Sequence, residues 1–119
     1  MTPEKDLLTA AYAAFNRRDI DAAVALMSPR VDWPNGMEGG RVHGRDEVRA
    51  YWKRQWAVLD PHVEPVRMVE EDTGKLRVDV HQVVRDLSGK ILADRMVEHV
   101  YAIRDGLIEH MEIRPPSHA

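Results

Sequence analysis

The side chains best suited to chemistry in this sequence lie on one face of a predicted strand, residues 91–103. Residues two apart in a strand point to the same side of the sheet, so His99 and Tyr101 share a face. A histidine changes its charge near neutral pH and can act as a general acid or base. A neighbouring phenol can donate a hydrogen bond to a developing oxyanion. This pattern makes His99 the first candidate for a general acid or base and Tyr101 a candidate hydrogen-bond partner or oxyanion donor.

Two further polar residues extend the same face. A two-residue turn at Ser88-Gly89 would place Gln82 beside His99. Arg95 lies on this face too, where it would either bind a carboxylate or lie in solvent at the end of the sheet. The alternative for His99 is a buried histidine held by a structural hydrogen bond, with structural roles for Tyr101 and Gln82 as well.

Asp32 is the second candidate for a general base. Asp32 and Trp33 alternate faces of a short extended segment, residues 30–33, so the carboxylate points outward if the indole points inward. One register slip or bulge would reverse this assignment. Asn35 and Met37 follow in a loop and are predicted to line the mouth of a pocket, although a turn alone also explains Asn35.

Aromatic residues are concentrated in two segments. Trp52 and Trp56 are four residues apart on one helical face with Tyr51 next to them, and Trp33 lies in the extended segment. They predict either an aromatic-walled pocket for a flat or apolar ligand or ordinary core packing. The predicted ligand-pocket residues are Tyr12, Phe15, Trp33, Asn35, Met37, Trp52, Trp56, Gln82, Val97 and Met111.

His81 has two alternative positions. A two-residue turn at Ser88-Gly89 places it on the face opposite His99, whereas a three-residue turn with a bulge brings it to the same face. The six histidines show no paired metal-binding spacing, and the glycines match no phosphate-binding loop. We therefore expect no metal and no cofactor.

The periodicity of apolar residues predicts the elements that position these side chains. Helices are expected from the Thr2-Pro3 cap to residue 16, over residues 20–27 and over residues 45–59, with Ser28-Pro29 ending the second. Residues 36–44 hold four glycines and are expected to form a loop. Strands are expected over residues 62–71, 76–87, 91–103 and 107–113. In the first of them, Pro65 requires an edge or a bulge.

A run of helices followed by a run of strands predicts an α+β fold with helices on one face of a mostly antiparallel sheet. The segments Asp19-Ile20-Asp21-Ala22, Val42-His43-Gly44-Arg45 and Arg104-Asp105-Gly106-Leu107-Ile108 resemble the nuclear transport factor 2-like superfamily. Within it, the chain is most similar to the SnoaL-like polyketide cyclase and ketosteroid isomerase branch. The resemblance covers nearly the whole chain and implies one domain, residues 1–119, in which a curved cone-shaped sheet encloses a deep hydrophobic cavity.

The resemblance does not transfer the isomerase mechanism. Trp33 occupies the position of that branch's aspartate base, and an indole cannot take up a proton. The position of its tyrosine donor matches Ala11, with Tyr12 adjacent, and that of its second acid matches His99. An aromatic residue that supports that site matches Trp52. The resemblance thus implies a shared cavity with different chemistry.

Composition limits the classes of partner. The 119 residues carry a net charge of −3 and no cysteine, which argues against nucleic acid, a disulfide framework and a thiolate nucleophile. No apolar run reaches the length of a membrane span, and no targeting segment is visible, so we expect a cytoplasmic protein without a membrane partner. The resemblance implies a homodimer formed through the outer sheet face.

Three hypotheses remain open. The first is an isomerase, cyclase or dehydratase that acts on a small apolar or aromatic carbonyl compound by general acid-base catalysis. The second is a non-catalytic module that binds a ligand in the same pocket, and the third is a protein-interaction domain that uses the outer sheet face around Val100.

Overall fold

The computed structural model describes residues 2–116 and contains three helices and six strands over that range. The helices are α1 (Pro3–Asn16), α2 (Ile20–Val24) and α3 (Gly44–Val58). The strands are β1 (Met27–Pro34), β2 (Arg41–His43), β3 (Leu59–Glu70), β4 (Leu76–Asp86), β5 (Ile91–Arg104) and β6 (Leu107–Arg114). None of the described helices is both long and apolar enough to cross a bilayer.

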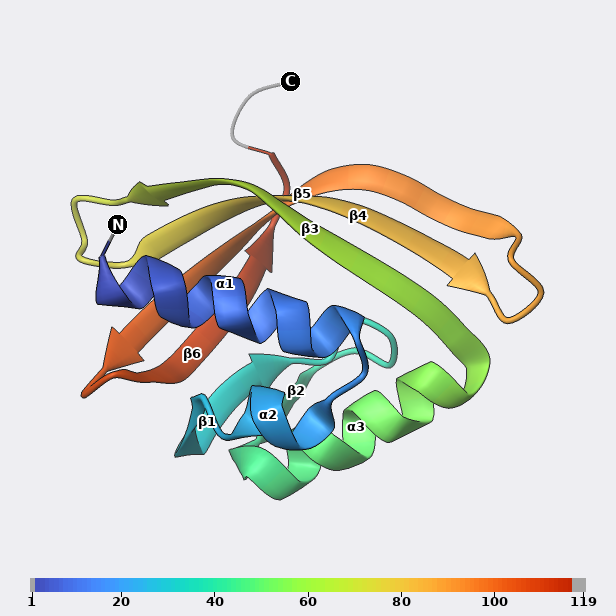
Figure 1. Cartoon of the computed structure of the whole chain (residues 1–119), viewed down its shortest axis with the longest axis horizontal. Coiled ribbons are helices and arrows are strands. Elements are labelled where there is room, and N and C mark those ends of the chain that lie inside the picture. Colours follow the sequence, from blue (N-terminus) through green and yellow to red (C-terminus); the bar gives the residue numbers. More distant parts are fainter. Residues whose placement is uncertain (1, 117–119) are drawn as a thin grey trace.

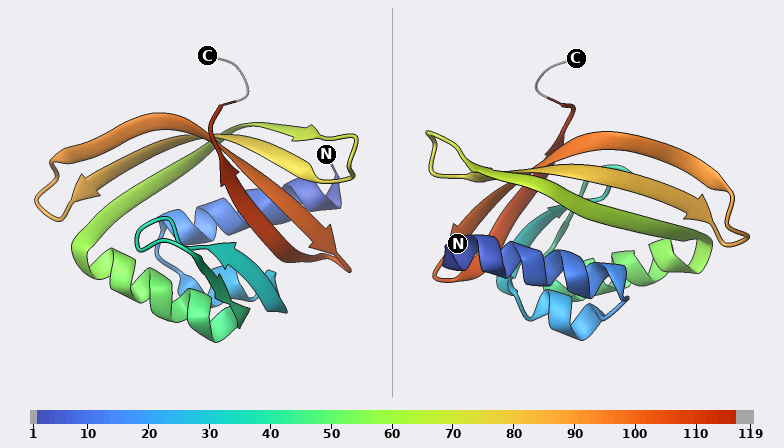
Figure 2. Two further views of the ribbon diagram at one scale, coloured as in Figure 1. Left: turned by 180° about the vertical axis from the view of Figure 1, so that it is seen from behind. Right: turned by 45° about the horizontal axis from the view of Figure 1, so that its top comes forward.

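The strands form one curved, open sheet in the order β2-β1-β6-β5-β4-β3. All neighbouring pairs are antiparallel except β1 and β6, which run parallel. The long strands β3, β4 and β5 arch over the three helices, which all lie on the same side of the sheet (Figures 1 and 2). The structure therefore confirms the predicted α+β architecture with a mostly antiparallel sheet.

Helix α1 carries an apolar stripe into this enclosure. The Thr2 side chain accepts a hydrogen bond from the backbone N–H of Lys5, and Pro3 occupies the first turn, where its missing N–H leaves no bond unmade. Leu8 and Tyr12 are four residues apart and both are buried, because this spacing aligns them on one helical face. The helix thus directs the Tyr12 phenol toward the sheet.

The second helix is shorter than predicted. It ends at Val24, and Met27 already belongs to β1, so Ser28-Pro29 lies inside a strand and does not end the helix. Met27 is 1% exposed and pairs with Ile108 of β6, whose N–H bonds to the carbonyl of Leu26. This pairing with a strand far along the chain outweighs the helical propensity of the alanine-rich segment.

The predicted loop over residues 36–44 contains a short strand. Residues Arg41–His43 form β2 and pair antiparallel with the end of β1. The turn between them is closed by Gly39 and Gly40, whose φ angles of 89° and 76° suit glycine. Three residues in a glycine-rich segment are too few to show a strand periodicity.

The strand pairing puts His81 on the outer face, but not through the two-residue turn from which that position was predicted. The N–H of Asp86 bonds to the carbonyl of Lys90, so the turn is longer, and a register shift between Val84 and Arg85 restores the pairing. Val78 pairs with His99 and Gln82 with Arg95, so these side chains share the concave face, whereas His81 pairs with Met96 on the outer face. The predicted irregularity at Pro65 is confirmed, because the register of edge strand β3 shifts between Pro65 and Arg67. The face that carries His99 is therefore the face that the helices cover.

Candidate functional site

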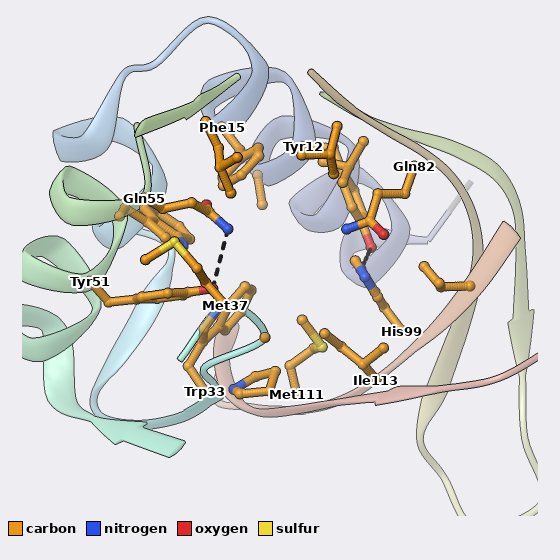
Figure 3. Close-up of a pocket in the computed structure, with 18 of the residues that line it drawn as sticks. Tyr12, Phe15, Trp33, Met37, Tyr51, Gln55, Gln82, His99, Met111 and Ile113 are labelled. Carbon is orange, nitrogen blue, oxygen red and sulfur yellow. Dashed lines mark hydrogen bonds between the residues drawn. The ribbon is translucent and has the colours of Figure 1, made fainter. Parts of the chain in front are cut away.

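A cavity of about 340 Å³ lies between the helices and the concave face of the sheet. Its volume suits a small organic ligand. Figure 3 shows Tyr12 and His99 on one side of the cavity and Tyr51 and Gln55 on the opposite side. The predicted site residues that line it are Tyr12, Phe15, Trp33, Met37, Trp52, Gln82, Val97, His99, Tyr101 and Met111.

A chain of three hydrogen-bonding side chains is buried at one wall of the cavity. The Tyr101 hydroxyl donates to the Tyr12 hydroxyl oxygen at 2.8 Å, and the Tyr12 hydroxyl lies 2.7 Å from Nδ1 of His99. All three side chains are at most 6% exposed. We assign the hydrogen of the Tyr12 hydroxyl to Nδ1, because its oxygen accepts from Tyr101, and this assignment leaves the imidazole hydrogen on Nε2.

Burial keeps this chain electrically neutral. It lowers the pKa of His99 from 6.5 to about 4, because a charged imidazolium loses its hydration in the interior. Burial likewise raises the pKa of Tyr12 and of Tyr101 above the usual value for a phenol. At neutral pH the site therefore holds a neutral imidazole whose Nε2–H has no protein acceptor among the described residues.

Aromatic rings form another wall of the cavity. The Phe15 and Trp33 rings each pack edge-on against Trp52, with ring centroids 5.2 Å and 5.7 Å away. Helix α3 supplies Trp52, β1 supplies Trp33 and α1 supplies Phe15. Rings from three elements thus present a stiff apolar surface suited to a flat ligand.

Three predicted site residues do not line the cavity: Trp56, Asn35 and Asp32. Trp56 stacks on Trp52, with centroids 5.7 Å apart, and lies beneath the Arg18 guanidinium. Trp56 therefore supports the aromatic wall from behind.

Asn35 holds the turn between β1 and β2. Its Oδ1 accepts from the N–H of Glu38 and its Nδ2 donates to the carboxylate of Glu38, both at 2.8 Å. Arg54 of α3 donates to the same carboxylate, and the bonds from Arg54 and Asn35 lower the pKa of Glu38 to about 2. Asn35 thus ties the turn to α3, which matches the turn alternative drawn from the sequence.

Asp32 points to the outside of the sheet, as the alternation with Trp33 predicts. Its carboxylate accepts a 2.5 Å hydrogen bond from Nε of Arg41, and His43 and His110 lie within 3.8 Å. Partial burial raises the pKa of Asp32. The hydrogen bond and the positive charge of Arg41 lower it by more, so the pKa of Asp32 lies below its usual value. An ionised, paired carboxylate outside the cavity cannot reach a ligand inside it.

Tyr51, Gln55 and Arg95 also line the cavity. The sequence indicated Tyr51 only as part of a possible aromatic wall and left Arg95 between a ligand-binding and a solvent position, and it gave no sign of Gln55 at the cavity. The Gln55 side chain donates to the Tyr51 hydroxyl at 3.2 Å, and the two are four residues apart on one face of α3. That spacing was visible in the sequence, but the direction in which the face points depends on packing against β1 and β3. Arg95 was placed on the correct strand face, and its position at the cavity follows from the strand register.

The described residues offer no centre for a metal ion. Over residues 2–116, no three histidine, aspartate or glutamate side chains are grouped closely enough to bind one. The cavity lining holds no aspartate or glutamate within the same range. The polar side chains among the described lining residues carry hydroxyl, amide, imidazole, indole and guanidinium groups.

A curved sheet that encloses a pocket against three helices defines the nuclear transport factor 2-like class of domains. The chain belongs to the SnoaL-like domain family, whose model matches residues 8–111, as the resemblance predicted. No curated protein matches the sequence.

Solved structures share the fold over almost the entire chain. An NTF2-like protein of unknown function from Burkholderia pseudomallei is 26% identical, with a TM-score of 0.83 and coverage of 98% of this chain and 92% of the other. TerC, co-crystallised with polyporic acid, is 27% identical, with a TM-score of 0.83 and coverage of 98% and 93%. A Mycobacterium tuberculosis protein in complex with estradiol-17beta-hemisuccinate is 16% identical, with a TM-score of 0.81 and coverage of 95% and 93%.

Proposed function

We propose that this protein binds a small, mainly apolar carbonyl compound in the cavity and holds the carbonyl oxygen at Nε2 of His99. The cavity volume of about 340 Å³ and its aromatic wall suit a flat organic molecule. The observation that carries the proposal is the chain from Tyr101 through Tyr12 to Nδ1 of His99. This chain orients the imidazole so that its remaining N–H is available to a ligand acceptor.

The electrostatic setting strengthens this hydrogen bond. The donor is buried, so a bond from it to a carbonyl oxygen is screened little by water. Each hydroxyl in the chain polarises the next, which makes Nε2–H a directed donor without a net charge. The same group would stabilise negative charge that develops on the carbonyl oxygen.

The second candidate is catalysis of proton transfer on the bound compound. It is favoured by the same hydrogen-bonded chain, which can stabilise an enolate oxygen. With the Tyr12 hydroxyl donating to Nδ1, the hydrogen of the neutral imidazole is on Nε2, so in this assignment His99 acts as a donor and not as the base. No carboxylate lines the described part of the cavity, and an isomerase, cyclase or dehydratase reaction would need its proton acceptor from the substrate or from water.

Related structures support a ligand in this cavity. TerC was co-crystallised with polyporic acid, and the Mycobacterium tuberculosis protein is in complex with estradiol-17beta-hemisuccinate. Both ligands are small organic molecules, and both proteins share the fold of this chain over nearly its full length. We extend this type of ligand, and not either compound, to the present protein.

We also propose that two copies associate through the outer sheet face and that the protein acts in the cytoplasm. Met96, which is 42% exposed on that face, supports a contact with a second copy. Light scattering of wild type and Met96→Glu tests this proposal, because a charged side chain in an apolar contact would dissociate the dimer. A wild-type mass of a single chain would contradict it.

Two substitutions of His99 test the roles of its two ring nitrogens one at a time. His99→Asn keeps an acceptor near the Nδ1 position for Tyr12 but removes the donor at Nε2, whereas His99→Gln keeps a donor near Nε2. In a thermal-shift screen of aromatic ketones and enones, a ligand at about 100 times its dissociation constant stabilises by roughly 2.7 kcal/mol. We expect wild type and His99→Gln to respond and His99→Asn to respond much less. Equal responses of all three, or none from wild type, would contradict the proposed function.

A further inference from the structure

Arg95 is the one cavity-lining residue in the described range with a full positive charge. It lies on the concave face of β5, and its side chain is exposed at the entrance of the cavity. Its Nε donates to Oε1 of Gln82 on the neighbouring strand at 2.9 Å. This bond orients the guanidinium and leaves its two terminal nitrogens available as donors.

The charge of Arg95 has no counter-charge in the described protein. Six other arginines pair with carboxylates at 3.2 Å or less, for example Arg54 with Glu38 and Arg114 with Glu71. Arg95 forms no ion pair with any residue in 2–116. The adjacent Asp94 points to the outer face, where it bonds to His81 at 2.7 Å. An oriented, unpaired guanidinium at a cavity entrance is complementary to an anion.

The concave face offers donors in a row. Gln82 uses its carbonyl oxygen to accept from Arg95, which leaves its amide N–H groups without a protein acceptor among the described residues. His99 uses Nδ1 to bind Tyr12, which leaves Nε2–H. Figure 3 shows Gln82 and His99 on the same side of the cavity. A ligand that satisfies this face must carry oxygen acceptors at more than one point.

The spacing of these donors defines the length of the ligand. Arg95 and His99 are four residues apart on β5, which corresponds to roughly 13 Å along an extended strand. Between them lies Val97, which lines the cavity with an apolar side chain. The matching molecule has an oxygen acceptor at its inner end, an apolar body and an anionic group at its outer end.

We propose that the ligand of this cavity is an amphipathic carboxylate that enters with its apolar carbonyl end first and is held at the entrance by Arg95 and Gln82. The inference rests on the proposed function, because it assumes that the inner end binds at His99. The inference specifies two further properties of the ligand, a negative charge at its outer end and the distance between its two ends. Phenolate or enolate oxygens at the same distance would satisfy the same chemistry.

Two probe molecules of the same shape test whether the cavity prefers a ligand with a negative charge at its outer end. One is an acetylbiphenyl with a carboxylate at the end opposite the ketone, and the other is its carboxamide. Their binding to the full chain is measured by calorimetry for wild type, Arg95→Gln and Arg85→Gln. Arg85→Gln is the matched control, because it removes the same charge from the neighbouring strand β4 at a residue outside the cavity lining.

We expect wild type to bind the carboxylate about tenfold more tightly than the carboxamide, as a charge-assisted hydrogen bond provides. Arg95→Gln should abolish this preference without weakening carboxamide binding, and Arg85→Gln should retain it. Binding of both probes with equal affinity, or a preference that survives Arg95→Gln, overturns the charge assignment and leaves the proposed function intact. Binding of neither probe by wild type overturns both.

Discussion

His99 and His81 lie on the paired strands β5 and β4, and they face opposite sides of the same sheet. His99 is 6% exposed and bonds to a neutral phenol, Tyr12. The His81 side chain is 45% exposed and bonds to a carboxylate, Asp94, at 2.7 Å. The same residue type therefore bonds to a neutral phenol in the interior on the concave face and to an exposed carboxylate on the outer face.

This difference extends to the two faces as a whole. The concave side of β4 and β5 is built from apolar residues with neutral donors between them, and its single cation lies at the cavity entrance. The outer side carries ion pairs such as Arg77 with Asp79 and Arg114 with Glu71. Alternation along two strands thus separates a low-dielectric pocket from a hydrated surface by the thickness of one sheet.

The largest difference between the faces should appear when a side chain is truncated. Trp52 is 2% exposed and contacts three other aromatic rings, so Trp52→Ala should lower the free energy of unfolding by about 3–5 kcal/mol. Met96→Ala on the outer face should cost less than about 1 kcal/mol, because that side chain is 42% exposed. Urea denaturation measures both values. Similar losses for the two variants would contradict the contrast.

The next largest effect concerns how the free energy of unfolding depends on pH through His99. The folded protein keeps His99 neutral down to a pKa of about 4, whereas the unfolded chain takes up the proton near 6.5. Between these values the unfolded state binds more protons, so stability falls as the pH decreases through this window. The loss amounts to about 3 kcal/mol.

The measurement is the free energy of unfolding of wild type at pH 7 and at pH 4, compared with that of His99→Gln. The variant should lose about 3 kcal/mol less than wild type over this interval. An identical pH dependence for wild type and His99→Gln would show that the imidazole is not held neutral by burial.

Removal of one hydroxyl tests the hydrogen-bonded chain itself. Tyr12→Phe leaves both Nδ1 of His99 and the Tyr101 hydroxyl without their partner in the interior, at a cost of roughly 1–3 kcal/mol. Tyr101→Phe removes only the terminal donor and should cost about 0.5–1.5 kcal/mol. Thermal and urea unfolding of the two variants provide the comparison. The reverse order of the two losses would contradict the central position of Tyr12 in the chain.

The smallest effect is expected on the outer face. Asp94→Asn breaks the pair with His81, in which both side chains are about half exposed, and should change stability by less than about 1 kcal/mol. The change should shrink further at high salt, because ions screen exposed charges. Unfolding at low and high sodium chloride tests this prediction, and a large loss that is insensitive to salt would refute it.

Much of the fold could be predicted from local patterns. The Thr2-Pro3 cap and the irregularity at Pro65 depend on residues within a few positions of one another. The end of α2 and the strand β2 could not be predicted in this way. Met27 joins β1 because Ile108, far along the chain, pairs with it, and local propensity carries no information about such a partner.

The candidate site likewise has a part that local patterns predict and a part that depends on contacts between distant residues. Alternation along β5 was enough to put His99, Tyr101 and Arg95 on one face. The bond between Tyr12 and His99 joins residues 87 positions apart, and only the packing of α1 against the sheet brings them together. That contact decides which nitrogen of the imidazole faces the cavity, and the sequence contains no sign of it, so the sequence alone left His99 as either a general acid or a general base.

The position of β6 in the sheet has a consequence for biosynthesis. This strand is the last in the described chain, yet it lies between β1 and β5 and supplies the parallel partner of β1. While the polypeptide emerges from the ribosome, Met27 and Val31 stay uncovered until β6 has been made. Until then one edge of β1 and one edge of β5 have no strand partner, and a chain that ends before β6 cannot join its two parts into one sheet.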